Sequence, residues 1–287
     1  LHIYQRTVSE FNIFYSTEDF LVFYTIISVY ARRYGITLLG LCQMIDHIHL
    51  LGSSCDLQTM SRFISASTSQ YVKEFNKKTG RTGRLFEKEY GSAIKKEVKK
   101  IRSAIAYLFN NPVEKMLCAR AEEYRWNYLR YFGEVRLKAL RHCSWRLRKS
   151  IKIVQERCRK GQYLKYSLIE MAFKGLEKEE KEYLTDWIIK LYFPFDVRKV
   201  TSYYRSHTEM LIAINSNTGS EHDIIEHSYC KTDVPYREMM VILKKTGLTD
   251  IKSVIMWPEE DKKRLEQFLK SKTSATYRQI RKFLHLK

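Results

Sequence analysis

Proline and glycine are both scarce in this chain, which has four prolines and eleven glycines in 287 residues. Such a composition leaves little room for long disordered linkers. No apolar run approaches the roughly 18 to 20 residues that a membrane-spanning helix needs, and there is no signal-peptide pattern. The chain begins at Leu1 without a methionine, which suggests that the natural N-terminus is cut or missing.

Paired cysteines are also lacking. The six cysteines are scattered, with no CxxC pair and no spacing typical of a zinc site. They indicate reduced, mostly buried thiols in a soluble protein of the cytoplasm. They are Cys42, Cys55, Cys118, Cys143, Cys158 and Cys230.

Positive charge, in contrast, is abundant. The chain has 51 Lys and Arg against 32 Asp and Glu, a formal net charge of +19. This excess predicts attraction to polyanions, with nucleic acid the leading candidate and an anionic membrane surface the second. The length suggests two domains, each large enough for its own core.

Hydrophobic periodicity predicts the order strand, helix, strand, strand, helix, strand, helix over the first 112 residues. Its first six elements match the split βαββαβ, or ferredoxin-like, arrangement. An antiparallel sheet with helices on one face would leave its other face free for a ligand. The expected elements are strands at 1–8, 36–45, 47–53 and 88–96, and helices at 17–34, 57–79 and 97–111, the last ended by Pro112.

Beyond Trp126 the pattern changes to helices with few strand signals, so the fold class is α+β with a mostly helical C-terminal part. We place the domains at 1–135 and 136–287. Residues 136–160 contain ten Lys and Arg against one acid, Glu156, which predicts a basic amphipathic helix. It would either lie along duplex phosphates or form a solvated outer face.

The stretch "QMIDHIHLLGSS" holds two histidines inside an apolar run. On a strand, His47 and His49 share one face while Ile48 points into the core. Two imidazoles side by side form a ready divalent-metal site, although both could instead be partly buried, hydrogen-bonded side chains. Asp46 could orient a histidine or form the turn between two strands, and we favour the turn.

The helix that ends near Pro112 offers two partners for these histidines. Tyr107 lies off its apolar stripe of Val98, Ile101, Ile105 and Leu108, and Asn111 follows one turn later. A tyrosine hydroxyl can act as a nucleophile, and an amide oxygen can ligate a hard cation. The alternative is an ordinary amphipathic tyrosine, since the chain has twenty.

Four segments in order resemble a known family. "MIDHIHLLGSS" resembles the His-hydrophobe-His motif of the HUH nucleases. "YLFNNPVEK" and the following "EEYRWNYLRYF" resemble the signature of REP-associated tyrosine transposases, bacterial relatives of single-tyrosine insertion-sequence transposases. "HIYQRTV" and "GRLFEKEY" fit the same pattern, so the resemblance covers roughly residues 1–132.

The resemblance implies a metal-dependent transposase that cleaves and rejoins single-stranded DNA near hairpins through a 5′-phosphotyrosine intermediate. His47, His49 and Asn111 would hold Mg²⁺ or Mn²⁺, and Tyr107 would be the nucleophile. Glu89 and Glu114 stand where the family usually has basic residues, which puts details of DNA contact in doubt.

Basic and aromatic residues are interleaved in segments expected to border the sheet. Cations that track phosphates, with aromatics that stack on bases, form the usual surface for single-stranded nucleic acid. The alternative is a solvated rim with its aromatics in the core. The candidates for nucleic-acid binding are Tyr4, Arg6, Arg81, Arg84, Phe86, Lys88 and Lys100.

The expected partner is single-stranded or hairpin DNA, with no membrane and no small-molecule cofactor. The protein would act as a monomer or a homodimer in the bacterial cytoplasm, at the nucleoid. One alternative is a non-catalytic nucleic-acid-binding regulator on the same scaffold, and another is an RNA-binding domain. Residues 258–287 suggest a terminal helical hairpin with Tyr277 inward, and residues 217–228 a polar loop.

Overall fold

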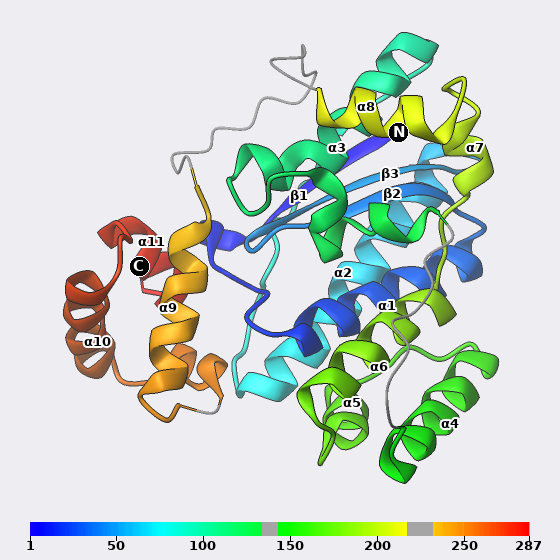
Figure 1. Ribbon diagram of the computed structural model, residues 1–287. Helices are drawn as coiled ribbons and strands as arrows, with labels where there is room; N and C mark the ends of the chain where they lie inside the picture. Colours follow the sequence, from blue (N-terminus) through cyan, green and yellow to red (C-terminus); the bar gives the residue numbers. More distant parts are fainter. Residues whose placement is uncertain (134–142, 217–231, 249, 287) are drawn as a thin grey trace.

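The computed structural model describes residues 1–133, 143–216, 232–248 and 250–286. At its centre is a four-stranded antiparallel sheet in the order β2-β3-β1-β4 (Figure 1). This order and the two helices between the strands confirm the ferredoxin-like prediction. The elements are β1 His2–Arg6, α1 Thr17–Tyr34, β2 Thr37–Gln43, β3 His47–Ser53, α2 Leu57–Thr79 and β4 Gly91–Ala93.

Local signals set the ends of α1 and α2. A capping box of Ser16 and Asp19 begins α1, and the Asp56 carboxylate accepts the Thr59 backbone N–H at the start of α2. Gly35 and Gly80 end these helices in the left-handed conformation that glycine adopts without strain. Both helices therefore begin and end where the sequence predicted.

The two faces of the sheet differ in chemistry. Ile3, Ile48 and Leu50 alternate with residues of the opposite face and join the buried apolar core. The opposite face carries the two histidines of β3. We expected this face to be free, but α3, Val98–Glu114, covers it, and the free-face prediction is wrong (Figure 1). The cover forms because α3 has its own apolar side chains to bury.

Proline inside α3 does not end the helix as expected. Pro112 lies in the last turn, and α3 continues to Glu114. Because Pro112 has no N–H, one backbone hydrogen bond of the helix is missing. The N–H groups of Lys115 and Leu117 still donate to the carbonyls of Asn111 and Pro112, at 3.1 and 2.9 Å. The helix therefore continues for two residues beyond Pro112.

Two side chains predicted to be buried are exposed: Val98 and Tyr277. Val98 occupies the first position of α3, and Tyr277 the first position of α11, Tyr277–Leu284. The first turn extends beyond the packed surface in each case, so periodicity alone overestimates the buried stripe.

The rest of the described chain is helical, which confirms a mostly helical C-terminal part. Helices α5 and α6 pack on α1, and α4 packs on α5 and α6. Helix α8 packs on α3, and α10 and α11 form a helical hairpin. The remaining elements are η1 Val8–Glu10, η2 Ala121–Glu123, η3 Arg125–Asn127, η4 Leu129–Tyr131, α4 Trp145–Arg159, α5 Tyr166–Phe173, α6 Lys178–Leu191, α7 Val197–Thr201, α8 His207–Asn215, α9 Val234–Lys245, η5 Ile251–Met256, α10 Glu259–Lys272 and α11 Tyr277–Leu284.

The predicted division at residue 135 lies among residues 134–142, outside the described part, and stays a prediction. The segment 217–231, which contains the whole of the predicted polar loop, also lies outside it. Buried apolar residues on both sides of the division belong to one continuous core. Among the described helices, none is long and apolar enough to cross a membrane.

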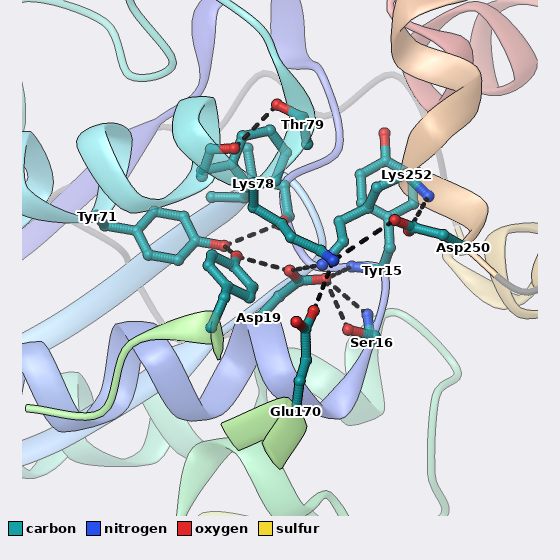
Figure 2. Close-up of polar contacts among 12 residues, drawn as sticks. Tyr15, Ser16, Asp19, Tyr71, Lys78, Thr79, Glu170, Asp250 and Lys252 are labelled. Carbon is teal, nitrogen blue, oxygen red and sulfur yellow. Dashed lines mark hydrogen bonds and ion pairs between the residues drawn. The ribbon is translucent and has the colours of Figure 1, made fainter. Parts of the chain in front are cut away.

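The carboxylate of Asp19 ties the N-terminal and C-terminal parts of the chain together (Figure 2). One oxygen accepts the backbone N–H groups of Tyr15 and Ser16 at 2.8 Å. The other accepts the Tyr166 hydroxyl and the Lys252 ammonium, both at 2.7 Å. Asp19 and Lys252 are both buried, so this is an internal ion pair with additional hydrogen bonds.

The C-terminal helix α11 is fixed to the N-terminal segment by His285. Its Nε2–H donates to the Asn12 carbonyl at 2.7 Å, and its ring stacks on Phe11 at 4.5 Å between centroids. Burial lowers the pKa of His285 to about 3, against a weaker opposite effect of the hydrogen bond. The imidazole is therefore neutral in the folded protein at ordinary pH.

Replacing Lys252 with Met should lower the free energy of unfolding by about 3 kcal/mol, because the Asp19 charge stays buried without its partner. Urea denaturation at neutral pH measures the change. Lys263→Met on the exposed face of α10 is the matched control and should change stability little. Equal losses in the two variants would show that the ion pair is unimportant.

The neutral His285 makes stability depend on pH. Its folded pKa lies below the unfolded value near 6.5, so the unfolded chain takes up a proton first and stability falls as pH drops from 6.5 toward 3. Between pH 7 and pH 5 this loss should be about 2 kcal/mol. His285→Gln, which keeps an amide donor, should show a loss smaller by that amount in urea titrations at both pH values. If His285→Gln lost as much stability between pH 7 and pH 5 as the unchanged protein, the neutral state of His285 would be contradicted.

Candidate active site

The two histidines of β3 lie side by side, as the strand alternation predicted. Their ring centroids are 5.1 Å apart, and both side chains are buried. Tyr4 of β1 pairs opposite His49 in the sheet register, stacks on its ring at 4.9 Å and meets His47 edge-on at 5.2 Å. Tyr4 thus covers the two imidazoles on the side of β1.

Helix α3 brings Tyr107 and Asn111 onto these histidines. The Tyr107 ring lies 5.3 Å from the His49 ring between centroids, and Asn111 Nδ2 lies 3.3 Å from His49 Nε2. Tyr107 is only 5 % exposed. We expected it on the polar side of the helix, away from the apolar stripe, and that expectation is wrong, because its ring faces the sheet and packs on His2 and His49.

His2 completes the surroundings of His49, and the sequence analysis missed it. His2 Nε2 lies 3.3 Å from His49 Nδ1, and its ring is 5.8 Å from the Tyr107 ring. The signal was present, because His2, Tyr4 and Arg6 share one face of β1 by alternation. The strand order places β1 beside β3, and only this pairing brings that face of β1 next to the histidines of β3.

Asp46 does more than form the turn that we favoured. It lies between β2 and β3, and its Oδ1 is 2.6 Å from His47 Nδ1. Burial opposes ionisation of Asp46, but the charge and hydrogen bond of His47, with Lys282 and Lys115, hold its pKa below the usual value. A carboxylate on Nδ1 fixes the ring orientation and leaves Nε2 as the nitrogen that can bind a ligand.

A second carboxylate lies near this pair and comes from the start of α9. Burial, followed by the negative charge of Asp46, raises the pKa of Asp233 to about 6. The cations Lys115 and Lys282 act in the opposite direction on Asp233. Asp233 is far from Asp46 in sequence, so no local pattern could have predicted this neighbour.

The donor set fits a divalent cation. Asn111 Oδ1 is buried and has no hydrogen-bond partner among the described residues, which is unusual for a buried amide. A half-turn of the amide would place this oxygen where Nδ2 now faces His49. Two imidazoles and an amide oxygen are then available, and within the described ranges no group of three His, Cys, Asp or Glu side chains offers an alternative.

The predicted nucleic-acid-binding residues have different surroundings. Tyr4 is buried in the histidine network, and Arg6 lies over the Tyr4 ring, 5.0 Å from its centroid. Phe86 is buried against Phe23 and Tyr71, which favours a core role over base stacking. Arg81 hydrogen-bonds within its own turn, to the Arg84 carbonyl and to Asn76.

Three predicted cations remain at the surface. Arg84 and Lys88 line a groove of about 480 Å³ between α2 and the segment before β4. Lys100 is exposed on α3 and pairs with Glu97 at 3.3 Å. The structure therefore brings together the predicted metal ligands and the tyrosine, but it distributes the predicted DNA contacts over separate places.

Comparison with protein families finds one match, to the family described as "Transposase IS200 like", over residues 1–111. The matched segment contains the four strands, the histidine pair, and α3 up to Asn111. Comparison with curated proteins and with solved structures gives no match.

Gly40 controls how closely α3 approaches the sheet. A Cβ there would lie 3.1 Å from side-chain carbons of Leu108 and Phe109, whereas one at Gly91 would lie 3.8 Å or more from its neighbours. Gly40→Val should therefore displace α3 and lower the free energy of unfolding by about 1 to 3 kcal/mol. Gly91→Val is the matched control for urea denaturation, and an equal effect of both would refute the close approach.

Proposed function

We propose that this chain, whose residues 1–111 match the IS200-like transposase family, cleaves and rejoins single-stranded DNA through its own tyrosine. The observation that carries the proposal is the meeting of Tyr107, Asn111 and His49 across α3 and β3. A nucleophile next to a set of metal-ligand donors is the arrangement that phosphoryl transfer requires. The finer resemblance to REP-associated enzymes supports the choice of substrate.

His47, His49 and Asn111 would hold Mg²⁺ or Mn²⁺. Such an ion, when bound, polarises a phosphate oxygen as a Lewis acid and neutralises charge that builds up on it. Asp46 keeps the His47 ring oriented through Nδ1, and His2 supports His49 through its Nδ1. The ligands are thus positioned by partners that are themselves part of the sheet.

Tyr107 would supply the nucleophilic oxygen. Its hydroxyl attacks the scissile phosphorus, a tyrosyl O–P bond forms, and the bond from phosphorus to the 3′ oxygen breaks. The proton lost by the hydroxyl is balanced by the one gained at the released 3′-hydroxyl. Because the phosphate ester is retained on the protein, a 3′-hydroxyl can reverse the step and rejoin the strand without an external energy source.

The burial of Tyr107 sets a condition on this chemistry. Its ring is enclosed by His2, His49 and the elements packed on α3, so a strand can reach it only if α3 or its neighbours shift. The resemblance to REP-associated enzymes implies a single strand at this site. We therefore propose single-stranded DNA beside a hairpin as the substrate, in the bacterial cytoplasm at the nucleoid, for a monomer or a homodimer.

A covalent adduct tests the proposal directly. Labelled single-stranded hairpin oligonucleotides, including those from DNA flanking its own gene, would be incubated with Mn²⁺, Mg²⁺ or EDTA and run on denaturing gels. We expect an adduct that needs metal and falls at least about hundredfold in Tyr107→Phe, because phenylalanine has no nucleophilic oxygen. Tyr277→Phe, at an exposed tyrosine of α11, is the matched control and should form the adduct normally.

The other outcomes point elsewhere. An adduct that survives Tyr107→Phe would reject Tyr107 as the nucleophile. Tight binding of the hairpins without an adduct under any metal condition would favour the alternative of a non-catalytic nucleic-acid-binding regulator. An adduct formed equally in EDTA would reject the metal ligands.

A further inference from the structure

Helix α4 carries an unusual concentration of unneutralised positive charge. Between Trp145 and Arg159 it has six exposed Lys and Arg side chains, and none forms an ion pair with a described residue. Its one acid, Glu156, pairs with Lys160 at 2.6 Å just beyond the helix. The six cations are Arg146, Arg148, Lys149, Lys152, Arg157 and Arg159.

We infer that α4 is a second nucleic-acid surface, which binds the phosphate backbone of duplex DNA apart from the strand at Tyr107. The inference rests on the proposed function only in taking DNA as the relevant polyanion. It assigns a partner to a helix that lies outside the matched family segment, residues 1–111.

The arrangement of the cations suits a rigid, regularly charged partner. Arg148, Lys152 and Arg159 share one side of the helix, because they are separated by four and seven residues. They span about 16 Å along the axis at 1.5 Å per residue. Duplex DNA presents one phosphate per about 3.4 Å on each strand, so the row can meet several phosphates at once.

An exposed aromatic residue stands at the start of this surface. Trp145 is 60 % exposed, and Arg146 and Lys149 lie over its ring at 5.6 and 5.9 Å from the centroid. An exposed indole with cations beside it can pack on a sugar or an unpaired base at the end of a stem.

The buried face of α4 argues against a membrane surface as the partner. Its apolar residues Leu147 and Val154 are fully buried, on the side where α5 and α6 pack. A helix that lies in a lipid interface must present its apolar face to the lipid. In α4 that face belongs to the protein core, and only the cationic face and Trp145 remain outside.

The position of α4 separates it from the candidate active site. Helix α4 packs on α5 and α6, which pack on α1, and α1 lies on the face of the sheet opposite α3 (Figure 1). With layers about 10 Å apart, the two sites are separated by roughly 30 Å. The DNA on α4 is therefore a different segment from the strand that would reach Tyr107.

The test is a binding measurement on the full chain with a blunt-ended duplex that has no single-stranded part. The triple variant Arg148→Gln, Lys152→Gln, Arg159→Gln should bind this duplex at least about tenfold more weakly at low salt. The slope of log affinity against log salt should fall by about 2 to 3, since each phosphate contact contributes about 0.9. Fluorescence anisotropy over a salt series gives both quantities.

The matched control removes the same charge from α10. Lys263, Arg264 and Lys272 are exposed there, on a helix that begins with three acids. The Gln variants of these three should bind the duplex within about twofold of the unchanged protein. Equal weakening by both triple variants would overturn the inference, because net charge alone would then explain the binding.

Two further measurements separate this inference from the proposed function. The α4 variant should still form the Tyr107 adduct with a short single-stranded oligonucleotide, and loss of that adduct with duplex binding unchanged would overturn the inference. Vesicles of phosphatidylglycerol provide the membrane comparison. Weaker vesicle binding with unchanged duplex binding would assign α4 to a lipid surface instead and would also overturn it.

Discussion

The buried carboxylate of Asp19 is the contact on which the arrangement of the chain depends. It closes the capping box that starts α1, and it also accepts the Tyr166 hydroxyl from α5 and the Lys252 ammonium from η5. Burial removes the hydration of the Asp19 carboxylate. This cost is offset only while the hydrogen-bond and ion-pair partners of Asp19 are present. One residue thus couples the beginning of α1 to two segments from the second half of the sequence.

The two faces of the sheet lie in chemically different environments. On the α1 face the strands present aliphatic side chains, and on the α3 face they present imidazole, phenol and amide groups. Gly40 lets α3 lie close to that second face, so Tyr107 and Asn111 reach the histidines. The closeness that assembles the site also buries it, so substrate access and site assembly oppose each other at α3.

Charge is distributed unevenly over this fold. Near the histidines, the carboxylates of Asp46 and Asp233 and the cations Lys115 and Lys282 offset one another in a partly buried cluster. On α4, in contrast, exposed cations stand without acidic partners. The net charge of +19 is thus partly concentrated on a surface far from Tyr107, where it does not perturb the buried groups around His47 and His49.

The sequence by itself determined the features that depend on neighbours along the chain. Capping residues and left-handed glycines set the ends of α1 and α2, and alternation placed His47 and His49 on one face. It also indicated Tyr107 and Asn111 one turn apart, because helical spacing is local.

Only the tertiary structure decided what surrounds those residues. The burial of Tyr107, the approach of Asp233 to Asp46, and the pairing of Lys252 with Asp19 all join segments far apart in sequence. Such contacts depend on which distant segments pack against each other, and periodicity shows that a face is buried but not which segment covers it. Spacing could therefore name the residues of the site, while packing determined their exposure and their charged neighbours.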